Sequence, residues 1–317
     1  MIKKSIDIIE KFVNEYGIQS VEIFDYIDSL KDMFRAYLRI KDYEAAIKAL
    51  NHLSEMYKKE ILGTDKWKSF DAINILYKIM REIRRHLDAP GEYLETYSRV
   101  LFDLLQQIYD KIIRNKTLPE NPSSAFQMLT WITTSLAKLW YSLSLFEDLM
   151  NLLNKTIELL DLAYELSDEN HKPEILAQKF RVLLRRAVVR FFAELDIENV
   201  EADLDACRKI VAELEGKYDE VELTYMKSDL ILFDGRVKNQ LKQFEASITN
   251  LRDFISILAI IPPEKINTNR MREIFDRAFK VLRDIRILGR RQLSPELKAK
   301  LKEVEKELKQ LKYTIFK

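Results

Sequence analysis

The stretch Tyr37-Leu-Arg-Ile-Lys-Asp42-Tyr43-Glu-Ala-Ala46-Ile-Lys-Ala-Leu50 has the pattern of two helices joined by a tight turn. Tyr37 ends one apolar stripe of helical spacing, and Ala46 and Leu50 lie one turn apart on the next. The small Ala46 allows the two helices to cross closely, and the large residues around it fill the angle between them. We therefore predict a helix–turn–helix with Tyr37, Ala46 and Leu50 buried together.

The composition extends this prediction to the whole chain. Its 317 residues include only 6 Gly and 7 Pro, while 47% are hydrophobic and 32% are charged. Average usage would give about 22 Gly, so most of the tight turns and phosphate-binding loops of sheet and nucleotide folds are missing. The apolar content supports a sizeable core and excludes bulk disorder. We predict an all-α protein of about thirteen helices. Abundant Lys, Glu, Arg and Ile resemble a thermophile composition.

Glycine, proline and short polar runs interrupt the apolar stripes and divide the chain into segments of helix length. The first stripe runs from Ile2 through Ile6 and Ile9 to Val13 and ends at Gly17. Because the connections are short, consecutive helices are expected to be antiparallel neighbours. Further breaks are expected at Gly63, 89–91, 117–123, 168–173, Asp196, Gly216, Gly235, 262–263 and 289–295.

Weaker copies of the first turn recur along the chain. The corresponding turn residues are Tyr43, Tyr93, Phe146, Ile197 and Val237. The first copy resembles the turn of a tetratricopeptide repeat, although the spacing of about 50 residues exceeds the 34 of the standard repeat. The resemblance implies antiparallel helix pairs stacked as a right-handed superhelix. An irregular helical bundle is the alternative.

Charge is distributed unevenly along the chain. Residues 270–317 contain 15 Lys and Arg against 7 Asp and Glu, while residues 194–222 contain 11 acids against 3 basic residues. We expect a helical-repeat domain over 1–262 and a basic C-terminal helical segment over 263–317, packed as a cap or protruding. Glu residues on this segment are spaced to pair with Lys300 and Lys309 along a helix.

The sequence lacks the usual signatures of catalysis. His52, His86 and His171 are far apart, so no helix face offers a pair of metal ligands. No phosphate-binding loop, dinucleotide fingerprint or nucleophile elbow is present. Cys207 lies in an apolar stripe among acids, which raise a thiol pKa, and is expected to be a packed small residue. We therefore expect no enzyme, no cofactor and no metal.

The cysteine count and the lengths of the apolar runs also predict the cellular compartment. The single cysteine cannot form an internal disulfide, which favours the cytoplasm. The first residues lack a signal-peptide core, and no apolar run approaches the roughly 18 residues that a membrane helix requires.

Arginines one turn apart on apolar helices are the strongest candidates for a binding site. Arg81 and Arg85 form one such pair, and Arg181 and Arg185 another. The tetratricopeptide resemblance implies that first helices line a concave groove, where arginine forks would bind carboxylates. We expect an interaction scaffold for a protein or an acidic peptide. The alternative for these arginines is structural pairing with acids such as Glu82 or the 194–222 stretch.

Two other surfaces carry alternative functions. The basic residues of 270–317 could form a nucleic-acid-binding arm. Gln310, Tyr313 and Phe316 resemble a sliding-clamp-binding peptide, with a helix end as the alternative. Trp131 and Trp140 share one expected helix but point in different directions, which favours core packing. The sequence leaves the oligomeric state and the partner open.

Overall fold

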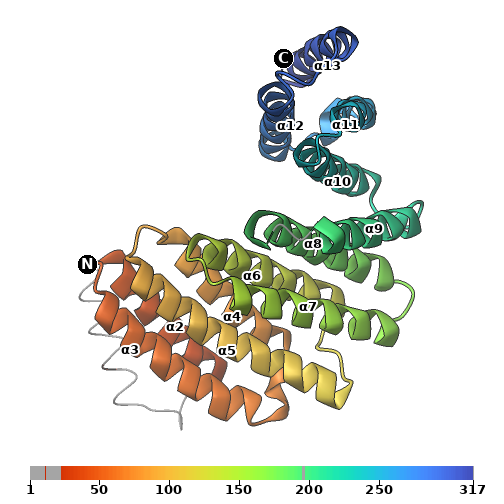
Figure 1. Cartoon of the computed structure of the whole chain (residues 1–317). Helices are drawn as coiled ribbons and strands as arrows, with labels where there is room; N and C mark the ends of the chain where they lie inside the picture. Colours follow the sequence, from red (N-terminus) through yellow and green to blue (C-terminus); the bar gives the residue numbers. More distant parts are fainter. Residues whose placement is uncertain (1–10, 12–22, 195–196, 317) are drawn as a thin grey trace. The chain divides into compact units, whose positions relative to one another are not determined.

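The computed structural model describes Lys11, residues 23–194 and residues 197–316. Over these residues the chain is all-α, with short connections and no strand (Figure 1). The expected first stripe, from Ile2 to Val13, lies outside the described residues. The helices are α2 (Ile23–Arg39), α3 (Tyr43–Met56), α4 (Phe70–Arg85), α5 (Gly91–Asn115), α6 (Pro122–Ser142), α7 (Phe146–Leu166), α8 (Lys172–Val189), α9 (Ile197–Leu214), α10 (Glu220–Gln240), α11 (Phe244–Leu258), α12 (Thr268–Leu288) and α13 (Pro295–Ile315).

The chain divides into two compact units, Met1–Arg185 and Arg186–Lys317. The division falls within α8, whereas the sequence led us to expect a boundary between residues 262 and 263. Residues 263–317 instead belong to the second unit, where α12 and α13 pack on α10 and α11. Apolar residues of all four helices form a single core, which explains why the charge of this segment does not separate it.

The first unit is built as two layers of helices. Helices α2, α4 and α6 are neighbours in one layer, and α3, α5 and α7 are neighbours in the other (Figure 1). The two layers are joined within the pairs α2/α3, α4/α5 and α6/α7, so the first helix of each pair always falls in the same layer. This alternation is the packing of a helical repeat, in which each pair buries its apolar face against the next.

Three helix pairs close with the same turn. Its first residue has a left-handed backbone, with φ of 60° at Lys41, 61° at Ser144 and 60° at Lys242. The next residue donates its backbone N–H to the carbonyl five positions earlier, over 3.0, 2.9 and 2.8 Å respectively. This is the Schellman geometry that satisfies the last carbonyls of a helix. The turn predicted at residues 41–42 is therefore correct, and its backbone recurs in α6/α7 and α10/α11.

The residues that define the first turn are packed largely as predicted. Ala46 is fully buried and Leu50 nearly so, whereas Tyr37 is only half-buried. Asp42 caps α3 by accepting the backbone N–H of Ala45 at 3.1 Å. Ala46 thus lies in the core of the α2/α3 pair, as a close crossing requires.

Gly235 is a correction to the sequence analysis. We expected it to break a helix and placed a repeat turn at Val237, but α10 runs through both residues and the turn lies at Lys242. A Cβ added at Gly235 would lie 3.4 Å from both Ser247 Oγ and Val281 Cγ1. Both α11 and α12 therefore pack against α10 at Gly235, where a Cβ would be in van der Waals contact with each of them.

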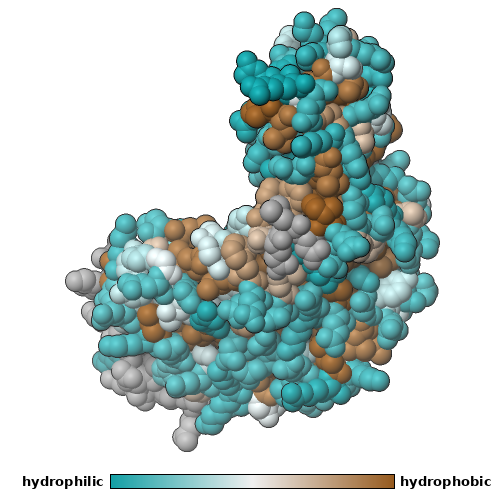
Figure 2. Space-filling model, in the orientation of Figure 1, coloured by the Kyte–Doolittle hydropathy of each residue, from teal (hydrophilic) through white to brown (hydrophobic). Residues whose placement is uncertain are grey.

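The surface is predominantly polar. In the view of Figure 2, hydrophilic residues cover most of the visible face, and hydrophobic residues appear in separate patches. Within the described part of the chain, no helix combines the length and the apolar character needed to cross a membrane.

Candidate functional site

Arg85 is part of a buried ion-pair cluster between α2 and α4. Its Nη1 lies 2.6 Å from Oε1 of Glu82, and Nε of Arg35 lies 3.6 Å from the other oxygen of the same carboxylate. The Glu82 side chain is only 3% exposed, so the carboxylate depends on these two arginines for compensation. Glu82 is the partner that the structural alternative named, and it lies on α4 itself; that Arg85 also binds a partner protein stays a prediction.

Arg81 lies one turn earlier on α4 in a different environment. Its side chain is exposed, and it forms no ion pair with any described residue. Arg84, also exposed, places its guanidinium 5.2 Å from the centre of the Trp131 ring on α6. Tyr77 of α4 packs on the same indole, with 4.6 Å between ring centres. We call Tyr77, Arg81, Arg84 and Trp131 the first-helix face.

The indole of Trp131 makes this face unlike a simple charged surface. Trp140 of the same helix is fully buried and donates its ring N–H to Ser98 at 2.8 Å, whereas Trp131 is half-buried against α4. The two indoles point in different directions, as expected. Core packing accounts for the whole Trp140 side chain but only for the buried part of Trp131. The sequence did not predict the contact between Arg84 and Trp131, because these residues come from different helix pairs.

The other layer of the first unit carries a different surface. Neighbouring helices there are linked by ion pairs between Lys58 and Asp103, between Arg99 and Asp148 at 3.1 Å, and between Lys155 and Asp110 at 2.7 Å. These three basic residues already have carboxylate partners, whereas Lys48 of α3 and Arg114 of α5 are exposed without an ion pair to a described residue. The exposed arginines of the first-helix face have no such partners in the described structure except the ring under Arg84.

Arg181 and Arg185 lie near the end of the first unit on α8. Both are half-buried, and Arg181 donates to Oε1 of Gln178 at 3.1 Å. Gln178 is buried and donates in turn to Glu174. Arg181 therefore has a local partner on α8 itself, as Arg85 has Glu82 on α4. That Arg181 and Arg185 bind a partner remains a prediction.

Arg186 near the end of α8 and Arg190, the first residue after it, have structural partners. Arg186 and Arg190 both bind Asp203 of α9, at 2.6 and 3.0 Å. The Asp203 side chain is 3% exposed, and the two guanidinium groups supply the charge and the hydrogen bonds that a buried carboxylate needs. Pairing with the acid-rich 194–222 stretch, which the sequence offered as the alternative for Arg181 and Arg185, is thus observed for Arg186 and Arg190.

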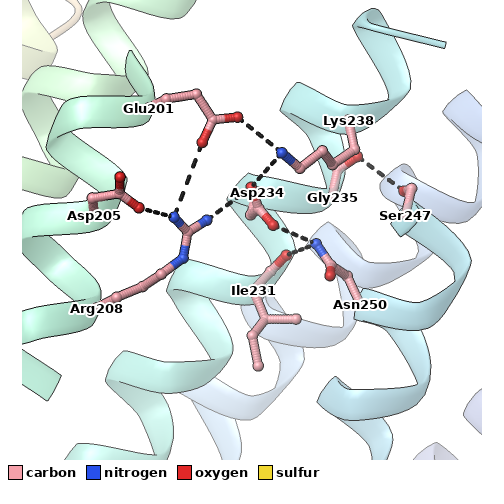
Figure 3. A network of polar contacts seen from close by, with 9 residues as sticks. All are labelled: Glu201, Asp205, Arg208, Ile231, Asp234, Gly235, Lys238, Ser247 and Asn250. Atoms are coloured by element: carbon pink, nitrogen blue, oxygen red, sulfur yellow. Dashed lines mark hydrogen bonds and ion pairs between the residues drawn. The ribbon is translucent and has the colours of Figure 1, made fainter. Parts of the chain in front are cut away.

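Acids two residues from Asp203 face another neighbour. Glu201 and Asp205 surround Arg208, whose Nη2 lies 3.2 Å from Oδ1 of Asp234 on α10 (Figure 3). Lys238 closes the network at 2.9 Å from Glu201. Asp203 and the Glu201–Asp205 pair therefore lie on two sides of α9, because residues two positions apart on a helix face different directions. The network joins α9 to α10 and leaves no open carboxylate site.

Helix α11 extends the same network. Asn250 donates to Oδ2 of Asp234 at 2.8 Å and to the carbonyl of Ile231 at 3.4 Å, and Ser247 donates to the carbonyl of Gly235 at 2.9 Å (Figure 3). Each of these bonds crosses from α11 to α10. The charges shown in Figure 3 therefore fix helix pairing in the second unit.

Some basic residues of the C-terminal segment are ion-paired within the second unit, namely Arg270, Arg277, Arg286, Lys300 and Lys309. Arg270 binds Glu222 at 2.8 Å and Arg277 binds Asp229 at 2.8 Å, so α12 neutralises acids of α10. Within α13, Lys300 pairs with Glu296 and Lys309 with Glu305, which confirms the pairing expected from their spacing. Part of the positive charge counted in this segment is thus compensated within the unit, and the larger part has no ion pair to a described residue.

The C-terminal residues extend a helix instead of forming a free peptide. Helix α13 runs through Ile315, and the Phe316 ring packs on Phe275 with 5.9 Å between ring centres. Phe316 contributes to the core of the second unit. This packing favours the helix-end alternative over the resemblance to a clamp-binding peptide.

The single cysteine and His171 both have defined neighbours in the described structure. Cys207 is fully buried, and burial raises its thiol pKa, with Asp203 adding to the effect. It is a packed small residue, as predicted. His171 pairs with Asp168 at 2.7 Å, and no group of three metal-ligating side chains occurs among the described residues.

No family model and no curated protein matches this chain. Among solved structures it is similar to a circular tandem repeat protein described as having a novel repeat topology and enhanced subunit contact surfaces. The match has a TM-score of 0.46 and 16% sequence identity, and it covers 98% of this chain and 76% of the other.

Proposed function

We propose that this chain is a tetratricopeptide-like interaction scaffold that binds an acidic, aromatic segment of a partner protein on the first-helix face. The observation that carries the proposal is the combination of the exposed Arg81 with the Arg84–Trp131–Tyr77 stack. The proposed action is non-covalent binding without catalysis.

The chemistry of the partner follows from the groups that are present. An exposed guanidinium without a carboxylate partner can form a two-pronged contact with an Asp or Glu side chain. The Trp131 indole and the Tyr77 ring offer an aromatic surface beside it, which suits an apolar or aromatic anchor. A segment with acids near an aromatic residue would satisfy both parts of the face.

Placement within the fold supports the same conclusion. Tyr77, Arg81 and Arg84 belong to α4, a first helix, and Trp131 belongs to α6, the next first helix in the layer. In tetratricopeptide proteins, which the chain resembles, this layer faces the ligand. The ion-paired surface of α3, α5 and α7 would be the solvated side.

The nucleic-acid alternative has less support. Arg270, Arg277 and Lys300 are engaged by Glu222, Asp229 and Glu296, which reduces the number of cations able to displace counterions from a phosphate backbone. We expect weak or no binding of mixed DNA or RNA even at low salt.

The test is a peptide-display selection against the immobilised full-length chain, using random peptides as the probe. We expect enrichment of sequences with Asp or Glu beside an aromatic residue. Replacing Arg81 and Arg84 together by Glu should weaken a selected peptide by about tenfold or more, because two charge-assisted contacts become repulsive.

The matched control is Lys48→Glu with Lys66→Glu. Both lysines are exposed, lie outside the first-helix face and form no ion pair with a described residue, so the change in net charge is identical. Selection of peptides without acidic residues, or an equal loss of affinity in the control variant, would overturn the proposal.

A further inference from the structure

A separate pocket in the second unit gathers positive charge where α12 turns into α13. It has a volume of about 500 Å³ and is lined by Arg286, Arg290, Leu293, Pro295, Lys298, Ala299, Leu301 and Lys302. No acidic residue contributes to the lining. We call it the α12/α13 pocket, and it is independent of the first-helix face.

The spacing of the lining residues explains why these cations converge. Pro295, Lys298 and Lys302 recur at intervals of three and four, which places them on one side of α13. Arg286 and Arg290 are likewise four positions apart, at the end of α12 and in the turn that follows. Two rows of cations therefore border the same hollow.

The turn between the two helices is tightly constrained. Gly289 donates its N–H to Ile285 at 2.8 Å and accepts that of Leu293 at 2.9 Å. A Cβ at Gly289 would lie 2.8 Å from Leu293 Cγ and 2.6 Å from the carbonyl oxygen of Ile285, so only glycine fits. Ser294 then caps α13 through the N–H of Leu297 at 3.2 Å. The pocket walls are thus positioned by the fold.

Most of these cations lack an acidic partner in the described structure. Arg286 binds Glu305, but Arg290, Lys298 and Lys302 form no ion pair with any described residue. The acids nearest in sequence on α13 are engaged elsewhere, since Glu296 binds Lys300 and Glu303 binds Arg252. Like charges bordering one hollow without compensation favour the binding of a multivalent anion.

The other lining residues of the α12/α13 pocket are apolar, which favours a ligand that also carries an apolar group. Leu293 and Leu301 are 7% and 4% exposed and form the floor together with Ala299 and Pro295. The volume falls within the range of small-molecule sites. A carboxylate carries one charge, whereas a phosphate monoester carries close to two at neutral pH and suits three uncompensated cations better.

We propose that the α12/α13 pocket binds a phosphate group carried on an apolar or aromatic body. Arg290, Lys298 and Lys302 would contact the phosphate oxygens, and the Leu293–Leu301 floor would receive the apolar part. The same chemistry occurs in a free organic phosphate and in the headgroup region of an anionic lipid.

Two probes separate these sources. Naphthyl phosphate is titrated into the full-length chain by calorimetry, and phosphatidylcholine vesicles with and without phosphatidic acid are tested by co-sedimentation. We expect binding of at least one probe, tighter binding of naphthyl phosphate than of inorganic phosphate, and a loss of about tenfold or more in the Lys298→Gln, Lys302→Gln variant. Binding of naphthyl phosphate alone would identify a free organic phosphate as the ligand, and binding of the phosphatidic-acid vesicles alone would identify a lipid headgroup.

The control is Lys280→Gln with Lys306→Gln, two exposed lysines of α12 and α13 outside the pocket lining and without an ion pair to a described residue. All four positions are exposed, and circular dichroism checks that helical content is unchanged. The proposal is overturned if neither probe binds, or if the control variant loses as much affinity as the pocket variant. Stronger binding of single-stranded RNA, lost equally in both variants, would instead indicate an extended basic surface.

Discussion

The arginines of α4 and those at the end of α8 share a helical spacing and differ in their surroundings. Arg186 and Arg190 both bind the buried carboxylate of Asp203, whereas Arg81 is exposed without an ion pair to a described residue. The difference lies in the neighbouring helix, because α9 brings a carboxylate to α8 while α6 brings the Trp131 ring to α4. We therefore propose a ligand site for an arginine pair on an apolar helix only where the adjacent helix supplies no acid.

The largest effect should come from removing the structural arginines. Replacing Arg186 and Arg190 together by Met leaves Asp203 buried without its counter-charges, and we expect the free energy of unfolding to fall by about 3–5 kcal/mol. Urea denaturation followed by circular dichroism measures this. Arg81→Met is the comparison and should change stability by less than about 0.5 kcal/mol. Equal losses in the two variants would remove the distinction between the two regions.

A smaller loss should follow from overpacking the helix crossing that sets the layers. Ala46 is fully buried, so Ala46→Phe should cost about 1–3 kcal/mol. Lys48→Phe adds the same ring at an exposed position two residues later and should be close to neutral. If Ala46→Phe melts at the wild-type temperature, α2 and α3 do not cross closely at Ala46 and the two-layer arrangement loses its clearest pair.

The pH dependence of stability distinguishes a third kind of ion pair, between α2 and α4. Burial raises the pKa of Asp28, but hydrogen bonds and charges from Lys31 and Lys78 outweigh it and leave the pKa below its ordinary value. A lowered folded-state pKa contributes stability above the unfolded pKa of about 4, and that stability is lost as pH falls through the folded value.

We expect Asp28→Asn to reduce stability by about 0.2–1 kcal/mol near neutral pH, because the carboxylate is partly exposed. The difference from wild type should vanish once the pH is below the folded pKa of Asp28. Urea unfolding of both proteins across acidic pH measures this. A difference that persists in strong acid would show that Asp28 acts through packing and not through its charge.

Local sequence signals predicted much of the fold. The turn at Asp42, the burial of Ala46 and the packed state of Cys207 all depend on neighbours close in sequence or on composition. Gly235 was misinterpreted because glycine weakens an isolated helix, and the close approach of Ser247 and Val281 cannot be read from the residues around it.

The candidate site was only partly predictable for a related reason. Arg81 was found from its helical spacing, but the stack of Arg84 on Trp131 joins residues from two helix pairs. Similarly, the choice between a ligand site and a structural role for Arg85 depended on Glu82 and on Arg35 from another helix. Such pairings are set by how helices stack, which apolar periodicity constrains but does not specify.

The most direct test of the first-helix face is a charge-swap measurement. Wild type and the Arg81→Glu, Arg84→Glu variant are each titrated with a selected acidic peptide and with the same peptide carrying Lys in place of its acids, using fluorescence anisotropy. We predict that wild type prefers the acidic peptide and that the variant prefers the lysine peptide, since exchanging both partners restores opposite charges across the contact. If the variant binds neither peptide better than wild type does, or if both proteins keep the same preference, the arginines of α4 do not contact the ligand.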